Sequence, residues 1–168
     1  MTKTVIIQAS SRSKGDSFKI SEQILSENNF DFIDLNTLKI NHYDYDYNNQ
    51  DDNFLALVTK IADKYDNIIF ITPIYWYTIS GLLKVFFDRF SDLIRIHKEI
   101  GRQYRGKNVG LISVNNSKAY LNNFSEPVDL SCQYLGMNFI KYIHVPVEND
   151  TISEPAINDL NTFTKLFL

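Results

Sequence analysis

The segment from residue 9 to residue 18 concentrates groups that bind phosphate. Its sequence is Ala9-Ser10-Ser11-Arg12-Ser13-Lys14-Gly15-Asp16-Ser17-Phe18, and a helix is expected to begin near Asp16. Hydroxyls, a guanidinium and the free N–H groups of a helix N-terminus all favour an anion. The chain contains neither G-x-G-x-x-G nor G-x-x-x-x-G-K-[ST], which disfavours a Rossmann site and a nucleoside-triphosphate hydrolase. A simple turn with Asp16 or Ser17 capping the helix is the alternative.

A second chemical signal lies at residues 72 to 81, where a wholly apolar strand is expected to end. Instead of a polar turn, the sequence continues with Pro73 and Ile74 and then with three aromatic residues, Tyr75, Trp76 and Tyr77. Large rings at the carboxyl end of a strand can line a pocket for a flat apolar ligand. Packing of the same rings under a neighbouring loop or subunit is an equal alternative.

The composition excludes several other kinds of chemistry. A net charge of −3 over 168 residues disfavours a general nucleic-acid binder. The only cysteine, Cys132, excludes an internal disulfide and a Cys-based zinc site, and we expect it to be a small core residue. The three histidines (His42, His97, His144) share no ligand spacing, so no metal site is predicted.

These residues must be positioned by an alternation of strands and helices. Short apolar runs at residues 4–9, 30–35, 68–71, 108–114 and 139–147 predict strands, the second of them at an edge of the sheet. Helical periodicity begins near residue 16 and recurs at about 54–61, 80–94, 120–135 and 156–167, with a long loop at 36–53. This alternation is typical of βαβ units around a mostly parallel sheet.

Five strands and five helices in this order predict an α/β fold of flavodoxin-like type. The expected core is a doubly wound, five-stranded parallel sheet of order 2-1-3-4-5 with helices on both faces. No linker or internal repeat is visible, so residues 1–168 are expected to form a single domain. Such sheets bind ligands at the carboxyl ends of the strands, where the winding direction reverses, so the loops after the first, third and fourth strands should form the site.

Together, the two loops resemble a known family. Thr72-Pro73-Ile74-Tyr75-Trp76-Tyr77, with the later Leu82-Leu83-Lys84 and Phe87-Asp88-Arg89-Phe90, resembles the flavodoxin-like NAD(P)H-dependent oxidoreductases, which include NADPH-dependent FMN reductases and NAD(P)H quinone reductases. The phosphate loop of that family resembles G-S-x-R-x-x-G-N-[ST]. Residues 9–17 are similar to it, with Ala9 in place of the glycine and Asp16 in place of the asparagine.

The resemblance implies bound FMN, with NADPH or NADH as the electron donor. Under it, Ser10, Arg12 and Ser17 would hold the FMN phosphate, helped by the backbone of Asp16 and Phe18. The isoalloxazine ring would be contacted, largely through backbone groups, by Pro73, Ile74, Tyr75 and Trp76. In the loop after the fourth strand, Asn115 can tolerate left-handed geometry and hydrogen-bond the pyrimidine edge of a flavin, and an ordinary turn there is an equal alternative.

The expected function is that of an FMN-dependent NAD(P)H oxidoreductase. A hydride would pass from the nicotinamide nucleotide through FMN to a small-molecule acceptor: a quinone, an azo or nitro compound, or free flavin. No catalytic side chain is expected, because the cofactor performs the hydride chemistry and the protein binds and orients it.

The helix from Gly81 to Ile94 is too apolar for one buried stripe. One face comprises Leu82, Phe86, Phe90 and Leu93, and a second comprises Leu83, Phe87 and Ile94. A second apolar face favours a homodimer, which the resemblance also implies, whereas one broad face against the sheet is the alternative. The sequence shows no export signal and no stretch long and apolar enough to span a membrane, so a cytoplasmic location is expected.

Two other functions stay open. A flavodoxin-type electron carrier would use the same fold and FMN without NAD(P)H turnover, although a net charge of −3 is weak for the acidic docking surface of such carriers. A fold relative that has lost FMN could act as a binding module, which Asp16 would explain. A serine hydrolase based on Gly15-Asp16-Ser17 is disfavoured, because the matching late Asp-x-x-His is missing.

Overall fold

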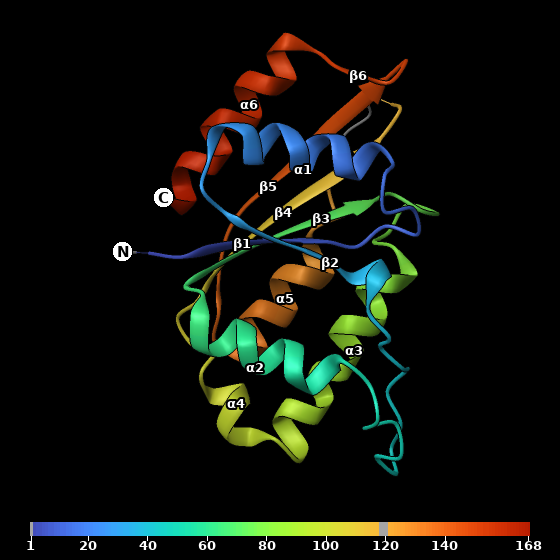
Figure 1. Ribbon diagram of the computed structural model, residues 1–168, viewed down its shortest axis with the longest axis vertical. Coiled ribbons are helices and arrows are strands. Elements are labelled where there is room, and N and C mark those ends of the chain that lie inside the picture. Colours follow the sequence, from blue (N-terminus) through green and yellow to red (C-terminus); the bar gives the residue numbers. More distant parts are fainter. Residues whose placement is uncertain (1, 118–120) are drawn as a thin grey trace.

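A six-stranded sheet lies between two layers of helices (Figure 1). The computed structural model describes residues 2–117 and 121–168. The strand order is β2-β1-β3-β4-β5-β6, and the first five strands are parallel, in the predicted order. Their bounds are β1 Thr4–Gln8, β2 Asp31–Asp34, β3 Asn67–Pro73, β4 Asn108–Asn115, β5 Asn138–Glu148 and β6 Thr151–Ile152. As expected, β2 lies at an edge of the sheet.

The sixth strand corrects the prediction of a five-stranded, wholly parallel sheet. Strand β6 pairs antiparallel with the end of β5, with Val147 opposite Ile152. The two strands are joined by Asn149 and Asp150, whose φ angles of 49° and 63° suit a two-residue hairpin turn. A strand of two residues is too short to show any period in the sequence, which is why the pattern missed it.

The helices cover the sheet in two groups (Figure 1). Helices α1 and α6 lie on one face, and α2, α3, α4 and α5 lie on the other. Their bounds are α1 Asp16–Glu27, α2 Phe54–Lys64, α3 Gly81–Arg95, α4 Lys98–Arg102, α5 Glu126–Leu135 and α6 Glu154–Thr164, with short 3₁₀ turns at Leu35–Thr37 and Lys165–Phe167. Among the described residues, no helix is long and apolar enough to cross a membrane.

Two helix assignments from the sequence were wrong. The helix expected from residue 120 begins at Glu126, with Pro127 in its first turn, where the fixed φ of proline suits a helix start; residue 120 itself lies outside the described residues. The sequence analysis also assigned no helix to the segment that forms α4. This helix has only five residues, too few for a readable apolar stripe.

The core has one cluster on each face of the sheet. Residues of α1 and α6 pack on one face and residues of α2, α3 and α5 on the other. Cys132 is fully buried in the second cluster, and burial raises the pKa of its thiol to about 12, which confirms it as a core residue. On α3 the expected faces were partly wrong, because Leu83 is buried and Leu82 only half-buried.

A buried ionic cluster ties the long 36–53 loop to α3. The Arg89 guanidinium bonds Asp52 at 2.5 Å and Asp92 at 2.8 Å, and all three side chains are almost completely buried. It also donates to the carbonyl of Asn41 at 3.1 Å. Burial by itself raises the pKa of Asp52, but hydrogen bonds from the N–H groups of Asn41 and Phe54 and the charge of Arg89 outweigh it, so the pKa is lowered.

Replacing Arg89 by methionine should leave two buried carboxylates without their cation. We expect the free energy of unfolding to fall by about 3–5 kcal/mol at pH 7. The native pKa of Asp52 lies below its ordinary value, so its stabilisation is present above pH ~4 and is lost as the pH falls through the native pKa. The difference in the free energy of unfolding between the variant and the wild type should therefore become smaller at acid pH. Urea unfolding at several pH values measures this.

A matched control removes the charges together. Adding Asp52→Asn and Asp92→Asn to Arg89→Met should recover part of the lost stability, because no unpaired buried charge remains. A loss under about 1 kcal/mol for Arg89→Met at pH 7, with no pH dependence, would contradict the assigned role of the cluster.

Candidate functional site

A small pocket of about 120 Å³ forms where the loops after β1, β3 and β4 meet. Its position at the carboxyl ends of these strands is the one predicted for a doubly wound sheet. The pocket brings together eight of the ten predicted site residues and adds Val114. The residues that line it are Ser10, Arg12, Asp16, Ser17, Pro73, Ile74, Tyr75, Val114 and Asn115.

A buried glutamine at the end of β1 supports the loop that follows this strand. Gln8 is completely buried, and its amide donates to the carbonyl of Ser13 at 3.0 Å. Ser21 of α1 donates to the Gln8 side-chain oxygen at 3.2 Å. At the start of the loop, the N–H of Ala9 donates to the carbonyl of Ile71 at 2.8 Å, which continues the sheet pairing. The loop is therefore anchored to both α1 and β3.

Helix α1 begins at the pocket without a side-chain cap. Its N-cap residue is Gly15, which corrects the alternative that Asp16 or Ser17 caps the helix. The N–H groups of Phe18 and Lys19 donate to the carbonyl of Gly15, so the expected contribution of the Phe18 backbone is already used within the chain. The N–H groups of Asp16 and Ser17 precede any intrahelical acceptor and are the ones left for an anion.

Lys19 offsets the negative charge of Asp16. Its ammonium lies 3.1 Å from Asp16 and 2.5 Å from Asp150, which comes from the turn between β5 and β6. Hydrogen bonds first to Asp150 and then to Asp16 raise the pKa of Lys19, and the same bond to Lys19 lowers the pKa of Asp150. Arg12 makes no ion pair within the described residues, so its exposed guanidinium is available to an anion.

Further hydrogen bonds join the three loops. Ser11 Oγ and Tyr75 OH are 3.1 Å apart, and the N–H of Ile74 donates to the carbonyl of Val114 at 2.9 Å. Asn115 Oδ1 accepts from the N–H of Ser117 at 2.8 Å, so Asn115 both forms a local turn and lines the pocket.

Thr72 and Ser80 are structural residues that sequence reasoning missed. Ser80 caps α3 by accepting from the N–H of Leu83, and its hydroxyl donates to the carbonyl of Ala9 at 2.7 Å. Its own N–H donates to Thr72 Oγ1 at 3.0 Å. A serine before a helix start is a readable cap signal, but the bond to Ala9 spans 71 positions and has no signature in the sequence.

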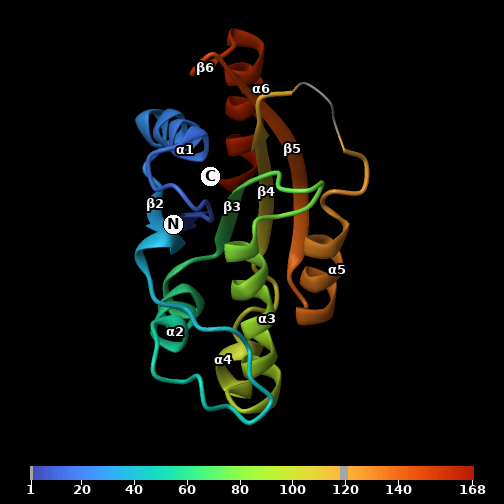
Figure 2. The ribbon, with the colours of Figure 1, turned by 90° about the vertical axis from the view of Figure 1, so that its right-hand side faces the viewer.

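Trp76 lies outside the pocket, at the tip of a tight turn. Tyr75 and Thr78 exchange two backbone hydrogen bonds, and the two residues between them, Trp76 and Tyr77, have φ angles of 49° and 66°. Such turns normally contain Asn-Gly, because both positions are left-handed. The two side chains are 93% and 76% exposed. The turn extends toward the segment before α5 (Figure 2), where Tyr77 lines a shallow hollow with residues 121–124.

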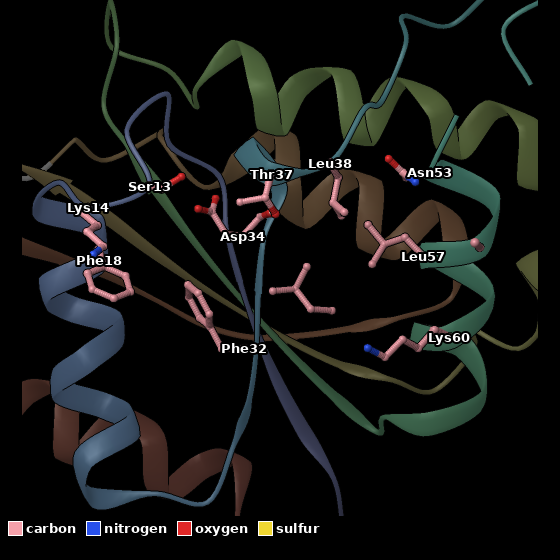
Figure 3. A pocket seen from close by; sticks show the side chains of 12 residues that line it. Ser13, Lys14, Phe18, Phe32, Asp34, Thr37, Leu38, Asn53, Leu57 and Lys60 are labelled. Carbon is pink, nitrogen blue, oxygen red and sulfur yellow. The ribbon is translucent and has the colours of Figure 1, made fainter. Parts of the chain in front are cut away.

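The ring of Phe18 also lies away from the pocket. It packs edge-on against Phe32, with 6.0 Å between the ring centroids. Both rings line a separate, larger cavity beside β2 (Figure 3). Neither the side chain nor the backbone N–H of Phe18 is therefore directed at the candidate site.

Comparison with known proteins now places the chain in a family. Residues 2–151 match the model of the NADPH-dependent FMN reductase family. The chain belongs to this family. The match confirms the resemblance inferred from the two loops, and the description of the family names FMN and NADPH, which are the cofactor and a donor expected from the sequence.

Individual relatives support the same family. YwqN of Bacillus subtilis, named an NAD(P)H-dependent FMN-containing oxidoreductase, is 29% identical over 97 residues. That match covers 49% of this chain and 54% of YwqN, so the chain spans about half the length of this relative.

Solved structures share the fold at low identity. The Trp repressor binding protein of Bacillus subtilis has a TM-score of 0.75 and 21% identity, over 94% of this chain and 95% of that protein. The flavoenzyme FerB of Paracoccus denitrificans, an NAD(P)H:(acceptor) oxidoreductase, has a TM-score of 0.72 and 18% identity, over 99% and 95% of the two chains.

Two charged residues of the loop after β1, Arg12 and Asp16, should affect FMN binding in opposite directions. Arg12→Ala should weaken it by about 1.5–3 kcal/mol, roughly 10- to 150-fold, as for a hydrogen bond to a charged group. Asp16→Asn removes a like charge beside the phosphate at a helix N-terminus and should tighten binding about 2- to 5-fold, less at high salt. Quenching of flavin fluorescence measures both.

Lys14→Ala is the matched control. Lys14 lies in the same loop but does not line the pocket, so its loss should change FMN affinity less than twofold. Equal effects of Arg12→Ala and Lys14→Ala would show that only the overall charge of the loop matters and would remove Arg12 from the site.

Proposed function

We propose that this chain is an FMN-dependent oxidoreductase that passes a hydride from NADPH or NADH through FMN to a quinone, an azo or nitro compound, or free flavin. The observation that carries the proposal is the single pocket in which an uncapped helix N-terminus and Arg12 meet the loop after β3. When bound there, FMN would supply the two-electron chemistry. The cytosol, which holds the nicotinamide donor, is the proposed compartment.

The phosphate end of FMN would lie at the start of α1. A dianion would be suited by the groups that line this end of the pocket: the N–H groups of Asp16 and Ser17, the hydroxyls of Ser10 and Ser17, and the guanidinium of Arg12, which forms no ion pair in the described part of the chain. Because Lys19 already holds Asp16, the carboxylate presents less negative charge to the phosphate than its sequence position indicates. This supports FMN over a fold relative that has lost its cofactor.

The ring end of FMN would lie between the loops after β3 and β4. Pro73, Ile74 and Tyr75 line the pocket from one side and Asn115 from the other. Asn115 uses its side-chain oxygen in a turn, which leaves its amide N–H₂ to donate to a carbonyl of the pyrimidine edge. These groups bind and orient the ring, and no side chain is assigned a proton-transfer role.

We assign Trp76 and Tyr77 to the acceptor rather than to FMN. Two bulky residues in left-handed geometry cost about 1–2 kcal/mol each, and the turn directs both rings outward next to the pocket. Strain of this kind is retained where it serves a function. Exposed rings beside a flavin suit flat aromatic acceptors, which stack on them.

A homodimer through α3 and α5 is also part of the proposal. Phe87, Phe90 and Ile94 of α3 border a groove of about 300 Å³, and Leu130 and Tyr134 of α5 line its other side. Leu130 is 57% and Tyr134 77% exposed. Apolar surface of this kind, rimmed by polar residues, is typical of a subunit interface. The groove extends the expected Gly81–Ile94 surface to α5.

Anaerobic reduction tests the function. The protein is loaded with FMN, desalted and mixed with NADPH or NADH. We expect retained flavin whose visible absorbance bleaches with one or both donors, and recovery of the absorbance on adding a quinone. Retained flavin that neither donor bleaches would identify an electron carrier, and failure to bind FMN would overturn the proposal.

The double variant Trp76→Asn/Tyr77→Gly should separate stability from catalysis. Asn-Gly is the preferred sequence for this turn, so the free energy of unfolding should rise by about 1–3 kcal/mol. The KM for a naphthoquinone should rise several-fold, because the stacking rings are lost, while FMN affinity stays within about twofold. Trp76→Phe is the control that keeps a ring. An unchanged KM in the double variant would contradict the assigned role.

A charged side chain introduced into the α3–α5 groove should dissociate the proposed homodimer. Tyr134→Asp places an unpaired charge in the proposed interface and should convert a dimer to a monomer in sedimentation velocity experiments. Leu166→Asp is the matched control, because Leu166 is 51% exposed and lies in the turn that directly follows α6, which lies on the opposite face of the sheet from α3 and α5. A wild-type monomer at micromolar concentration would exclude the homodimer.

A further inference from the structure

A second cavity lies apart from the FMN pocket. It has a volume of about 600 Å³ and runs along the outer edge of β2, between the start of α1 and α2 (Figure 3). This volume lies within the usual range of small-molecule sites. Its apolar lining consists of Phe18, Phe32, Ile33, Leu38, Ala56 and Leu57.

The cavity wraps around the edge of the sheet. In the described sheet β2 pairs only with β1. Phe32 packs toward the α1 side of the sheet, and the next residue, Ile33, packs toward the α2 side, yet both line the same cavity. An exposed sheet edge is normally covered or carries charged side chains. Here β2 carries Asp31 and Asp34 at its two ends, but its middle residues, Phe32 and Ile33, are apolar and both line the cavity.

Two lysines give the cavity its charge preference. Lys14 and Lys60 lie at opposite sides of it (Figure 3). Neither forms an ion pair within the described residues. The single carboxylate of the lining, Asp34, already accepts from the N–H of Asn36 at 3.0 Å. An organic anion with an apolar body would thus meet two exposed lysines and an apolar wall together.

The cavity and the FMN pocket share one loop. Ser13 and Lys14 line the cavity, whereas Ser10, Arg12 and Ser17 line the FMN pocket. The position of Ser13 is fixed by a hydrogen bond, because the side-chain amide of Asn36, which follows β2, donates to its hydroxyl at 3.1 Å. A ligand that contacts Ser13 and Lys14 would therefore act on the same loop that carries the residues of the FMN pocket.

We propose that this cavity is a second ligand site, that it binds a small organic anion with an apolar body, and that its occupancy is coupled to FMN binding through the loop of residues 10–17. The proposal of a ligand site (the binding half) is based on the cavity alone, whereas the proposal of coupling to FMN (the coupling half) also rests on the proposed function. Coupling of this kind is reciprocal, so each ligand changes the affinity of the other by the same factor.

The binding half is tested with 2-naphthalenesulfonate, added to ¹⁵N-labelled protein with and without FMN. We expect saturable amide shifts at residues 13–14, 32–38 and 56–60. Lys60→Glu should weaken binding about 5- to 20-fold through reversal of one nearby charge. Lys165→Glu makes the same charge change at an exposed position outside the cavity and should change it less than twofold.

Ala56→Trp provides a second, steric test. Ala56 lies on the exposed side of α2 and lines the cavity, so an indole there should fill part of the space without disturbing the core and should abolish the shifts. Shifts that map to the α3–α5 groove, or equal effects of Lys60→Glu and Lys165→Glu, would overturn the site.

The coupling half is tested by measuring FMN affinity with and without saturating 2-naphthalenesulfonate. We expect a change of about 3- to 10-fold, in either direction, that disappears in Ala56→Trp. Unchanged FMN affinity would overturn the coupling. If the protein bound no FMN at all, the proposed function would fail, while the titration without FMN would still decide whether the cavity binds.

Two classes of compound have the apolar body and the anionic groups that the cavity favours. A ring with anionic groups occurs at the adenosine phosphate end of a nicotinamide nucleotide and also in free organic acids. Displacement of 2-naphthalenesulfonate by adenosine 2′,5′-bisphosphate would assign the cavity to the nucleotide, and no displacement would assign it to a separate organic acid.

Discussion

Parallel pairing of β1 with β3 and of β3 with β4 is the constraint on which the candidate site depends. It places Ala9 beside Ile71 and Ile74 beside Val114, so three loops far apart in the sequence begin next to one another at the carboxyl ends of the strands. The bond from Ser80 to the carbonyl of Ala9 then ties the start of α3 to the loop after β1. Because these bonds are buried, breaking one would leave an unsatisfied polar group. The pocket is thus held by the same bonds that hold the sheet.

Charge is distributed differently at the site and in the core. At the site, Asp16 and Asp150 share the single positive charge of Lys19, and Arg12 forms no ion pair within 4 Å among the described residues. In the core, Arg89 satisfies Asp52 and Asp92 and fixes a long loop that has no regular structure of its own. The first arrangement favours an incoming anion, whereas the second holds loop and helix together. A loop rich in acidic and aromatic residues can be ordered in this way without a hydrophobic stripe.

The loop after β1 has a part in two proposed sites. Its residues are divided between them: Ser10, Arg12, Asp16 and Ser17 line the FMN pocket, whereas Ser13 and Lys14 line the cavity beside β2. Gln8 supports the loop between the two through a completely buried amide. A segment with ligands on both faces has to adopt a geometry that suits both, which is the physical basis for coupling between them.

The sequence by itself determined the family and the order and parallel pairing of the first five strands, because apolar runs of strand length and two continuous loop motifs are local signals. It also identified Cys132 as a core residue and the loops that meet at the pocket. Only the tertiary structure decided that Trp76 lies outside the pocket and that Phe18 packs beside β2, because backbone φ angles and ring packing depend on neighbours distant in the chain. The sequence also overstated how strongly the charge of Asp16 opposes a bound phosphate. Its partner Lys19 is close in sequence, but Lys19 is also bound by Asp150, which comes from a hairpin that no sequence period predicts.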